Sequence, residues 1–410
     1  MKVSSAFWAI VVMAGFAELG YVTLNISAMP VYLREEIGLG EATITAVGSV
    51  FLLTEALFRA PMGMLSDRIG RRRLIVLGPL LTVFTALATL IVHHPLLFLI
   101  LRALDGLGAA MLWPSAYAAI GDTVPKERRS WAMSFLNMTY MGGVALGPLA
   151  GGLANDLSGT RQASFYLVAA LFATAVVIAW RFYPRDGRPK PANSEPDPSP
   201  GFSFKAFLDA AKIVPGHLLV GFIVFFGIGL VMLLVKLFAM DEYGISETAF
   251  GLGLVVPALL IAGLSLPLGR FADHIGHIRG VQVGLSLGAL VMWSVVLPAK
   301  PPIVWIIMAA GLGAVSFVLA FSAWMAELSE VYPERRGVVL GASGAAQGVG
   351  SILGALTGGL LYEHGGFTLG DFTMPSHRVP FLGCAVMLTL GALLSLFVLR
   401  PRRTPITPHS

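Results

Sequence analysis

The sequence predicts an all-α membrane protein whose twelve transmembrane helices form two pseudo-symmetric six-helix bundles, and three observations support this fold class. Of the 410 residues, 56% are hydrophobic and only 12% are charged, whereas a soluble domain carries about 25% charged residues. Apolar runs long enough to cross a bilayer, which takes roughly 20 residues, recur along the whole chain. A charged loop sequence between such runs is also written twice, half a chain length apart.

Each apolar run is expected to form one transmembrane helix. The first run is long, carries Glu18 and is followed by no small-residue cleavage site, so we do not expect a removed signal peptide. The one cysteine, Cys384, lies in the last run and is expected to be a packing residue. The twelve runs cover 6–33, 43–65, 74–93, 96–119, 130–154, 163–182, 213–239, 247–269, 280–299, 301–326, 337–361 and 379–399.

Lys and Arg are distributed unequally between the two sets of loops. The set that includes both termini and the segment after the sixth run carries 21 of them, and the opposite set carries 4. Because cytoplasmic loops are enriched in Lys and Arg, we expect a multi-pass protein of the cell membrane with both termini in the cytoplasm. This asymmetry accounts for the sequence pI near 9.4, so the charge indicates no nucleic-acid partner.

The chain divides at its only long polar break, Pro184–Ser203, which is rich in proline and charge and is typical of an extended linker. We therefore expect an N-terminal bundle (1–183), a cytoplasmic linker (184–205) and a C-terminal bundle with a short cytoplasmic tail (206–410). Segments of the first half recur 206 to 208 positions later in the second half. Halves that run in the same direction predict parallel repeats about an axis along the membrane normal. The recurring pairs are 35–41 with 241–247, 63–70 with 269–276, 122–129 with 330–336 and 147–152 with 354–359.

The repeated loop carries the first family resemblance. From Gly63 to Arg72 the chain reads GMLSDRIGRR, which matches the signature G-x-x-x-D-[RK]-x-G-[RK]-[RK] of the major facilitator superfamily at every defined position. The chain resembles this superfamily over essentially its whole length. The resemblance implies the major facilitator fold, and a loop that holds the two halves together on the cytoplasmic side. Asp67 would then meet the start of the eleventh helix near Gly337, and Asp273 the start of the fifth near Ser130.

Residue chemistry supports a role of this loop in gating. Gly63 permits close helix contact and Gly70 permits a tight turn, while an acid such as Asp67 can accept hydrogen bonds from a helix N-terminus. The alternative is that the basic residues, including Arg68 and Arg71, only set the topology. The second copy has His274 and His277 in place of basic residues, which predicts a weaker or pH-sensitive contact.

The fifth run contains Gly143-x-x-x-Gly147-Pro148-x-x-Gly151-Gly152. This sequence is similar to the signature of the superfamily's drug:proton antiporters. The glycines would form a groove for a neighbouring helix and Pro148 would bend the helix, so we expect this helix to gate the pathway. The alternative is generic packing of small residues. The eleventh run has Ala355 in place of the proline, so the bend is expected in one half only.

Charged residues inside the apolar runs are the candidates for proton coupling, because charges in mid-membrane are costly and usually face a cavity or one another. The fourth run reads Arg102-x-x-Asp105-Gly-x-Gly-Ala-Ala. It resembles a signature whose arginine is associated with proton coupling, with Asp105 in place of the usual amide. The alternative is a local ion pair of these two residues. Glu55 and Arg59 are four residues apart and are expected to neutralise one another.

Glu18 has no basic residue on its own helix, and its position resembles that of an acid in the first helix of drug antiporters. We therefore rank Glu18 first as proton carrier, Asp105 second and Glu55 third. The rival for Glu18 is a structural ion pair with Arg102.

Five of the six intramembrane charges lie in the first half, and the sixth, Lys236, lies near the outer end of the seventh run, where it could instead reach the membrane surface. The second half offers mainly Phe, Met, Leu and Gly. This asymmetry predicts an amphipathic or lipophilic substrate that meets polar groups on one wall and an apolar surface on the other. The candidate substrate-binding residues, each of which could equally serve helix packing, are Tyr21, Asn25, Trp113, Tyr117, Asn137, Tyr140, Lys236 and Gln347.

These features favour a secondary active transporter that works by alternating access and couples inward proton flow to export. A carrier of a nutrient or lysolipid, uncoupled or symporting, is the alternative within transport. A membrane sensor that does not transport is the alternative of another class. The sequence contains no catalytic constellation and no His, Cys, Asp or Glu cluster at metal spacing, so we expect no enzyme activity, no metal and no cofactor. The expected partners are a small molecule, protons and the lipid bilayer, and the expected state is a monomer.

Overall fold

A computed structural model describes residues 5–125, 128–184, 212, 214–331, 336–370 and 372–399. The tail after Leu399 and nearly all of the predicted linker lie outside the described residues. Within the described part, eleven helices are long and apolar enough to cross a membrane. Helix α6 (Arg129–Ser158), with 30 residues, is also long enough to cross a membrane, but it contains many small and polar residues. The predicted all-α fold is confirmed, and each predicted apolar run falls on one long helix, except that the first and the seventh are interrupted.

The first half begins with a helix that changes its winding. Residues Thr23–Ala28 form a π-helical segment, η1, between α1 (Ser5–Val22) and α2 (Met29–Glu35). Such a wide turn disturbs the regular backbone ladder and is frequent at functional sites. The remaining helices are α3 (Glu41–Ile69), α4 (Arg71–Thr89), α5 (Pro95–Thr123), α6 and α7 (Ala163–Phe182).

The second half repeats this order, and its first helix is also interrupted at the corresponding level. Helix α9 (Pro215–Met232) ends before Leu233, and α10 (Val235–Tyr243) continues in the same direction after the break. With the repeat offset of 206 positions, Leu233 corresponds to Ser27 within η1. The other elements are α11 (Glu247–Ile275), α12 (His277–Val296), α13 (Ile303–Val331), α14 (Arg336–His364), the antiparallel strands β1 (Phe367–Leu369) and β2 (Phe372–Met374), η4 (Ser376–Arg378) and α15 (Val379–Val398).

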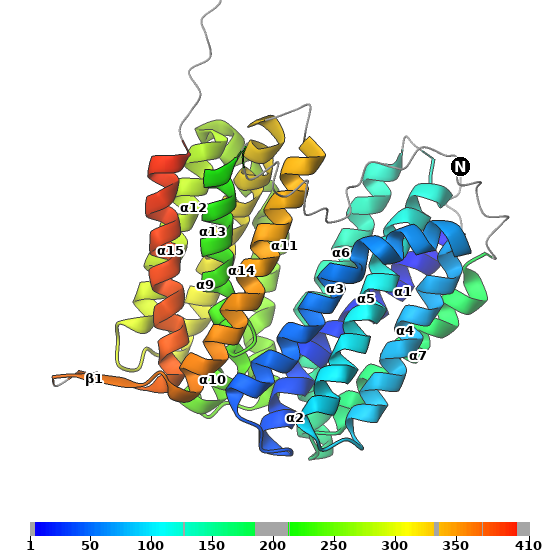
Figure 1. Ribbon diagram of the computed structural model, residues 1–410, viewed down its shortest axis with the longest axis horizontal. Coiled ribbons are helices and arrows are strands. Elements are labelled where there is room, and N and C mark those ends of the chain that lie inside the picture. The colour runs from blue at the N-terminus through cyan, green and yellow to red at the C-terminus, as the bar shows by residue number, and fades with distance from the viewer. Residues whose placement is uncertain are drawn as a thin grey trace, which may run out of the picture.

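The two halves meet through α3 with α14 and through α6 with α11. These are the two pseudo-symmetric interfaces of the molecule. Figure 1 shows the halves close together at the end where α2 and α10 lie, and diverging at the end where the N-terminus lies. We call the first the contact end and the second the opposite end. At the contact end, hydrogen bonds and ion pairs join the two halves.

The buried apolar side chains follow the same division. One core cluster joins the first half to the contact end of the second half, and there it includes Leu237, Phe238 and Phe381. A separate cluster around Trp324 and Leu328 belongs to the second half alone. The core is therefore continuous between the halves only where they touch.

Candidate functional site

Glu18 lies in an acidic and aromatic cluster of the first half. Its residue exposure is 4%, and its carboxylate lies within hydrogen-bonding reach of the Tyr140 hydroxyl. The Tyr140 ring makes an edge contact with Trp113 at 5.1 Å between centroids, and Trp113 lies 6.2 Å from Tyr117. Among the described residues, no cation lies within ion-pairing distance of Glu18. The predicted rival, an ion pair of Glu18 with Arg102, is therefore absent from this conformation.

Arg102 and Asp105 form a buried ion pair within α5. Each residue is 1% exposed, and Nη1 of Arg102 lies 2.7 Å from Oδ2 of Asp105. Arg102 also donates to the side-chain oxygen of Asn25 in η1 and stacks over the ring of Phe51 at 4.7 Å, while Asp105 accepts from Thr85. The local ion pair that sequence offered as an alternative for this motif is present, and all of these partners belong to the first half.

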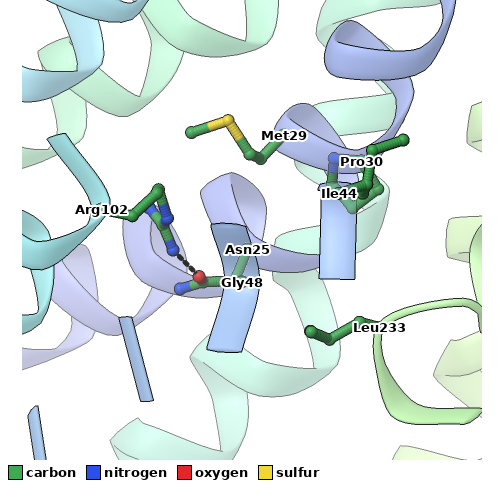
Figure 2. Close-up of a pocket in the computed structure, with 7 residues that line it drawn as sticks. All are labelled: Asn25, Met29, Pro30, Ile44, Gly48, Arg102 and Leu233. Atoms are coloured by element: carbon green, nitrogen blue, oxygen red, sulfur yellow. Dashed lines mark hydrogen bonds between the residues drawn. The ribbon is translucent and has the colours of Figure 1, made fainter. Parts of the chain in front are cut away.

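A small cavity lies beside this ion pair (Figure 2). Its volume is about 10 Å³, close to the room that a single water molecule needs. Asn25 and Arg102 line it from the first half, and Leu233, from the break between α9 and α10, lines it from the second half. A Cβ atom added at Gly48 would lie 2.6 Å from Cδ1 of Leu233. The second half therefore covers one side of the Arg102 site through close apolar packing.

Glu55 and Arg59 form the predicted ion pair between neighbouring turns of α3. The Arg59 side chain is 61% exposed and the Glu55 side chain 16%. Since Glu55 already has this partner, it is a weaker candidate for proton binding than Glu18.

The glycines of the fifth run form a groove, as expected. Cβ atoms added at Gly143, Gly147 and Gly151 would each lie 2.6–2.8 Å from side-chain atoms of α1 or η1. Glycine at these positions thus allows α6 to lie directly against the first helix. Gly152 has a different neighbour, because a Cβ there would meet the backbone of Glu247 in the other half at 2.6 Å. The motif therefore contacts both the Glu18 helix and the interface between the halves.

The repeated loops have the predicted tight turns. Gly70 and Gly276 have φ values of +102° and +89°, a region that favours glycine. In contrast, a Cβ added at Gly63 would lie an ordinary 3.6 Å from its nearest neighbour, a carbon of Pro114. In this conformation, the contact of Gly63 with α5 is thus not one that requires glycine, and its role in gating stays a prediction.

The acids of the two loops have partners within their own halves. Asp67 pairs with Arg71, and Asp273 lies 3.2 Å from His277. Neither acid forms an ion pair with the other half among the described residues. The expected partners lie near Ser130 and Gly337, whose side-chain surroundings are outside the described residues. Their gating role, like that of Arg68, stays a prediction.

A second buried charge cluster lies at the contact end. Lys236 of α10 is 1% exposed and pairs with Glu247, the first residue of α11, which is also 1% exposed. Glu247 in addition accepts from Asn155 at 3.0 Å and from Arg161 at 2.7 Å, and Lys236 donates to Ser27. We call these five residues the gate cluster. Burial lowers the pKa of the Arg161 guanidinium, but its hydrogen bond to Glu35 and the charges of Glu247, Glu35 and Asp156 raise the pKa by more.

From sequence, Lys236 is a candidate for substrate binding or for reaching the membrane surface. It is 1% exposed and does not reach the surface, and its contact with substrate stays a prediction. Sequence reasoning did not single out the other four residues of the cluster as functional. The available signal was that Lys236 and Glu247 are opposite charges at the neighbouring ends of consecutive helices.

The comparisons with known proteins agree with this architecture. The sequence profile of the Major Facilitator Superfamily matches residues 10–214 and 217–410. The chain belongs to the Major Facilitator Superfamily. It is similar to Multidrug resistance protein 2 of Bacillus subtilis (strain 168), with 23% identity over 86% of this chain and 88% of the relative. It is also similar to Multidrug resistance protein MdtG of Escherichia coli O9:H4 (strain HS), with 26% identity over 88% and 85% of the two chains.

A crystal structure of a mutant of the nucleoside transporter NupG has the same fold, with a TM-score of 0.81 and 13% sequence identity over 96% of this chain and 100% of that chain. As a member of this superfamily, the chain is a multi-pass membrane transporter and not an enzyme.

The remaining candidate substrate-binding residues of this superfamily member lie in different surroundings. Tyr21 is buried against Phe172 and lies 3.3 Å from the hydroxyl of Thr82, so it packs within the first half. Asn137 is exposed. Gln347 is partly buried and donates to Ser343 at 3.3 Å. Their contacts with substrate stay predictions.

The second half supplies a cluster of phenylalanine rings that sequence did not single out. Phe317 and Phe321 of α13 stack at 5.4 Å between centroids, and Phe225 of α9 lies 6.3 and 6.4 Å from them. Phe317 and Phe321 are more than one-third exposed. The second half thus exposes an apolar surface formed by these phenylalanine rings, in agreement with its predicted composition.

Proposed function

We propose that this transporter exports small amphipathic or lipophilic molecules and couples export to the inward flow of protons. The observation that carries the proposal is Glu18, a buried acid whose surroundings hold aromatic rings and, among the described residues, no ion-pairing cation. A carboxylate in apolar surroundings without a counter-charge changes its protonation state at low cost in other contacts. The relatives' names, which describe multidrug resistance proteins, support the same substrate class.

We assign the contact end to the outer face of the membrane. This orientation follows from the excess of Lys and Arg on the loops of the opposite end, and it puts both termini in the cytoplasm. With this assignment, the present conformation is closed to the outside and its halves diverge towards the cytoplasm. Substrate would enter from that side and meet Glu18, Tyr140 and Trp113 on one wall and the Phe317–Phe321 surface on the other.

The proposed mechanism separates the tasks of the two buried acids of the first half. Asp105 is held by Arg102 and Thr85, so its charge is compensated within the bundle. Glu18 lies against Gly143 of the α6 groove, and α6 contacts the second half. Proton binding at Glu18 would remove a charge from the substrate wall and alter the α1–α6 contact. Release of the substrate to the outside and of the proton to the inside then completes one cycle of a monomer.

The test is transport by purified protein in proteoliposomes with an imposed pH gradient, with a fluorescent lipophilic cation as the probe. Glu18→Gln should abolish the response to the gradient, because it cannot exchange a proton, while binding of the probe persists in a thermal-shift assay. Glu36→Gln is the matched control, since Glu36 is an exposed loop acid. Gradient-driven transport by Glu18→Gln at the wild-type rate would remove Glu18 from this role.

A further inference from the structure

The gate cluster joins two residues of the second half to three of the first. Lys236 and Glu247 belong to adjacent helices of the second half and pair with each other. Nζ of Lys236 also donates to the backbone oxygen of Ser27 at 2.9 Å and to its hydroxyl at 2.7 Å. The carboxylate of Glu247 accepts from Asn155 and Arg161. The ion pair can therefore stay intact when the halves separate, whereas its four bonds to the first half cannot.

The surface of the first half is complementary to the orientation of this pair. Ser27 presents acceptor oxygens to the ammonium group, and it does so from the π-helical segment η1. Asn155 and Arg161 present donors to the carboxylate. In a pair with the reverse orientation, the carboxylate would face the carbonyl oxygen of Ser27 and the ammonium group would face the guanidinium of Arg161. Both contacts are repulsive, and charged groups without suitable partners are costly in a buried site. The fit is specific for one orientation of the charges.

The same contact is reinforced by the backbone of α11. The amide of Thr248, in the first turn of α11, donates to Asp156 of the first half at 2.9 Å, a favourable position for an acid. Gly152 gives α11 room to approach, as its added Cβ would lie 2.6 Å from Glu247. Three residues before Lys236, Leu233 packs on Gly48 and covers the cavity beside Arg102 (Figure 2).

We propose that the Lys236–Glu247 pair is the outer gate of this transporter. It binds, as one preformed unit, to the surface made by Ser27, Asn155 and Arg161, and it thereby closes the contact end and the route to Arg102 and Asp105. Opening exposes the pair to water, which replaces the partners of the first half. This role is independent of which acid carries the coupled proton.

The test exchanges the two charges and measures the separation of the halves without substrate or pH gradient. Cys384 is the only cysteine, so Cys384→Ala gives a thiol-free chain. Spin labels on cysteines at exposed positions 157 and 297 report on the contact end, and labels at 64 and 266 report on the opposite end. For Lys236→Glu with Glu247→Lys, which keeps an ion pair but reverses it, we expect the ratio of separated to closed molecules at the contact end to rise at least about tenfold. The labels at the opposite end should move closer.

A second variant, Arg161→Met, changes only a partly exposed loop residue of the first half and should shift the same ratio in the same direction. Lys300→Met is the control, because Lys300 lies over Tyr243 within the second half. If the exchange and Arg161→Met both leave the two distance distributions unchanged, the pair is a structural element of the second half and the proposal is wrong. A poorly folded exchange variant leaves Arg161→Met to decide. Gradient-driven transport by Glu18→Gln at the wild-type rate would contradict the proposed function and not the gate.

Discussion

The two pseudo-symmetric interfaces of this transporter show how a duplicated contact can acquire different roles. Position 247 at the α6–α11 interface corresponds to position 41 at the α3–α14 interface, and both are glutamates. Glu247 is buried against Lys236, Arg161 and Asn155. Glu41 is more exposed and lies 3.7 Å from Arg34. Position 30, which corresponds to Lys236, is a proline, so Glu41 has no counterpart of this lysine.

Backbone contacts have stayed alike at the two interfaces. Asp156, at the end of α6, accepts from the amide of Thr248 at 2.9 Å. Glu363, at the end of α14, accepts from the amide of Ala42 at 3.0 Å. Each half thus places an acid at the N-terminus of a helix of the other half, where the helix dipole favours negative charge. The comparison indicates that symmetric caps align the halves and that a buried ion pair at one interface sets the strength of closure.

The largest effect is expected from Glu247→Gln. It leaves Lys236 without its counter-charge in a buried site, a loss that typically costs about 3–5 kcal/mol. Because the closed contact end buries Lys236, the halves should separate, and the spin-label distance between positions 157 and 297 should increase. The matched variant Glu41→Gln should change this distance little, because partly exposed ion pairs contribute about 0–1 kcal/mol. Equal responses of the two variants would contradict the inference that Glu247 contributes more to closure than Glu41.

The next effect tests whether packing, unlike charge, is symmetric. Gly152→Ala and Gly359→Ala each place a Cβ within 3 Å of the other half, near Glu247 and near Thr45 respectively. Overpacking of this kind costs about 1–3 kcal/mol, so both should shift the contact end towards separation by similar amounts in the same distance measurement. Gly142→Ala is the control, since nothing lies within 4 Å of its added Cβ. A response confined to Gly152→Ala would show that the interfaces differ in packing as well as in charge.

Much of the fold could be predicted because its determinants are local and periodic. Each apolar run gave a helix, and the glycines at 70 and 276 adopt the positive φ values that a tight turn requires. Hydropathy alone could not reveal the break at Leu233, because leucine residues on both sides of it continue the apolar run. Likewise, the sequence around Thr23–Ala28 contains nothing that distinguishes a π-helical segment from an α-helix.

The candidate site could be predicted only where partners are close in sequence. Arg102 and Asp105 are three residues apart, and Glu55 and Arg59 four, so their pairing follows from helix geometry. Lys236 and Ser27 are 209 positions apart, and their contact depends on how the two halves meet. The burial of Glu247, which decides its role, is a property of that interface and not of any motif.

The smallest effect is expected from the helix-capping acids. Asp156→Asn and Glu363→Gln keep a side-chain oxygen near each amide but remove the negative charge. A charge at a helix N-terminus contributes about 0.3–1 kcal/mol, so each variant should raise the proportion of separated molecules by less than about tenfold. The caps lie at different interfaces and share no partner, so the double variant should show the product of the two single effects. Charge effects are screened by salt, and the increase should therefore be smaller at high ionic strength. A response to Asp156→Asn as large as that of Glu247→Gln would assign closure to the caps, and the buried ion pair would then only follow the movement of the helices.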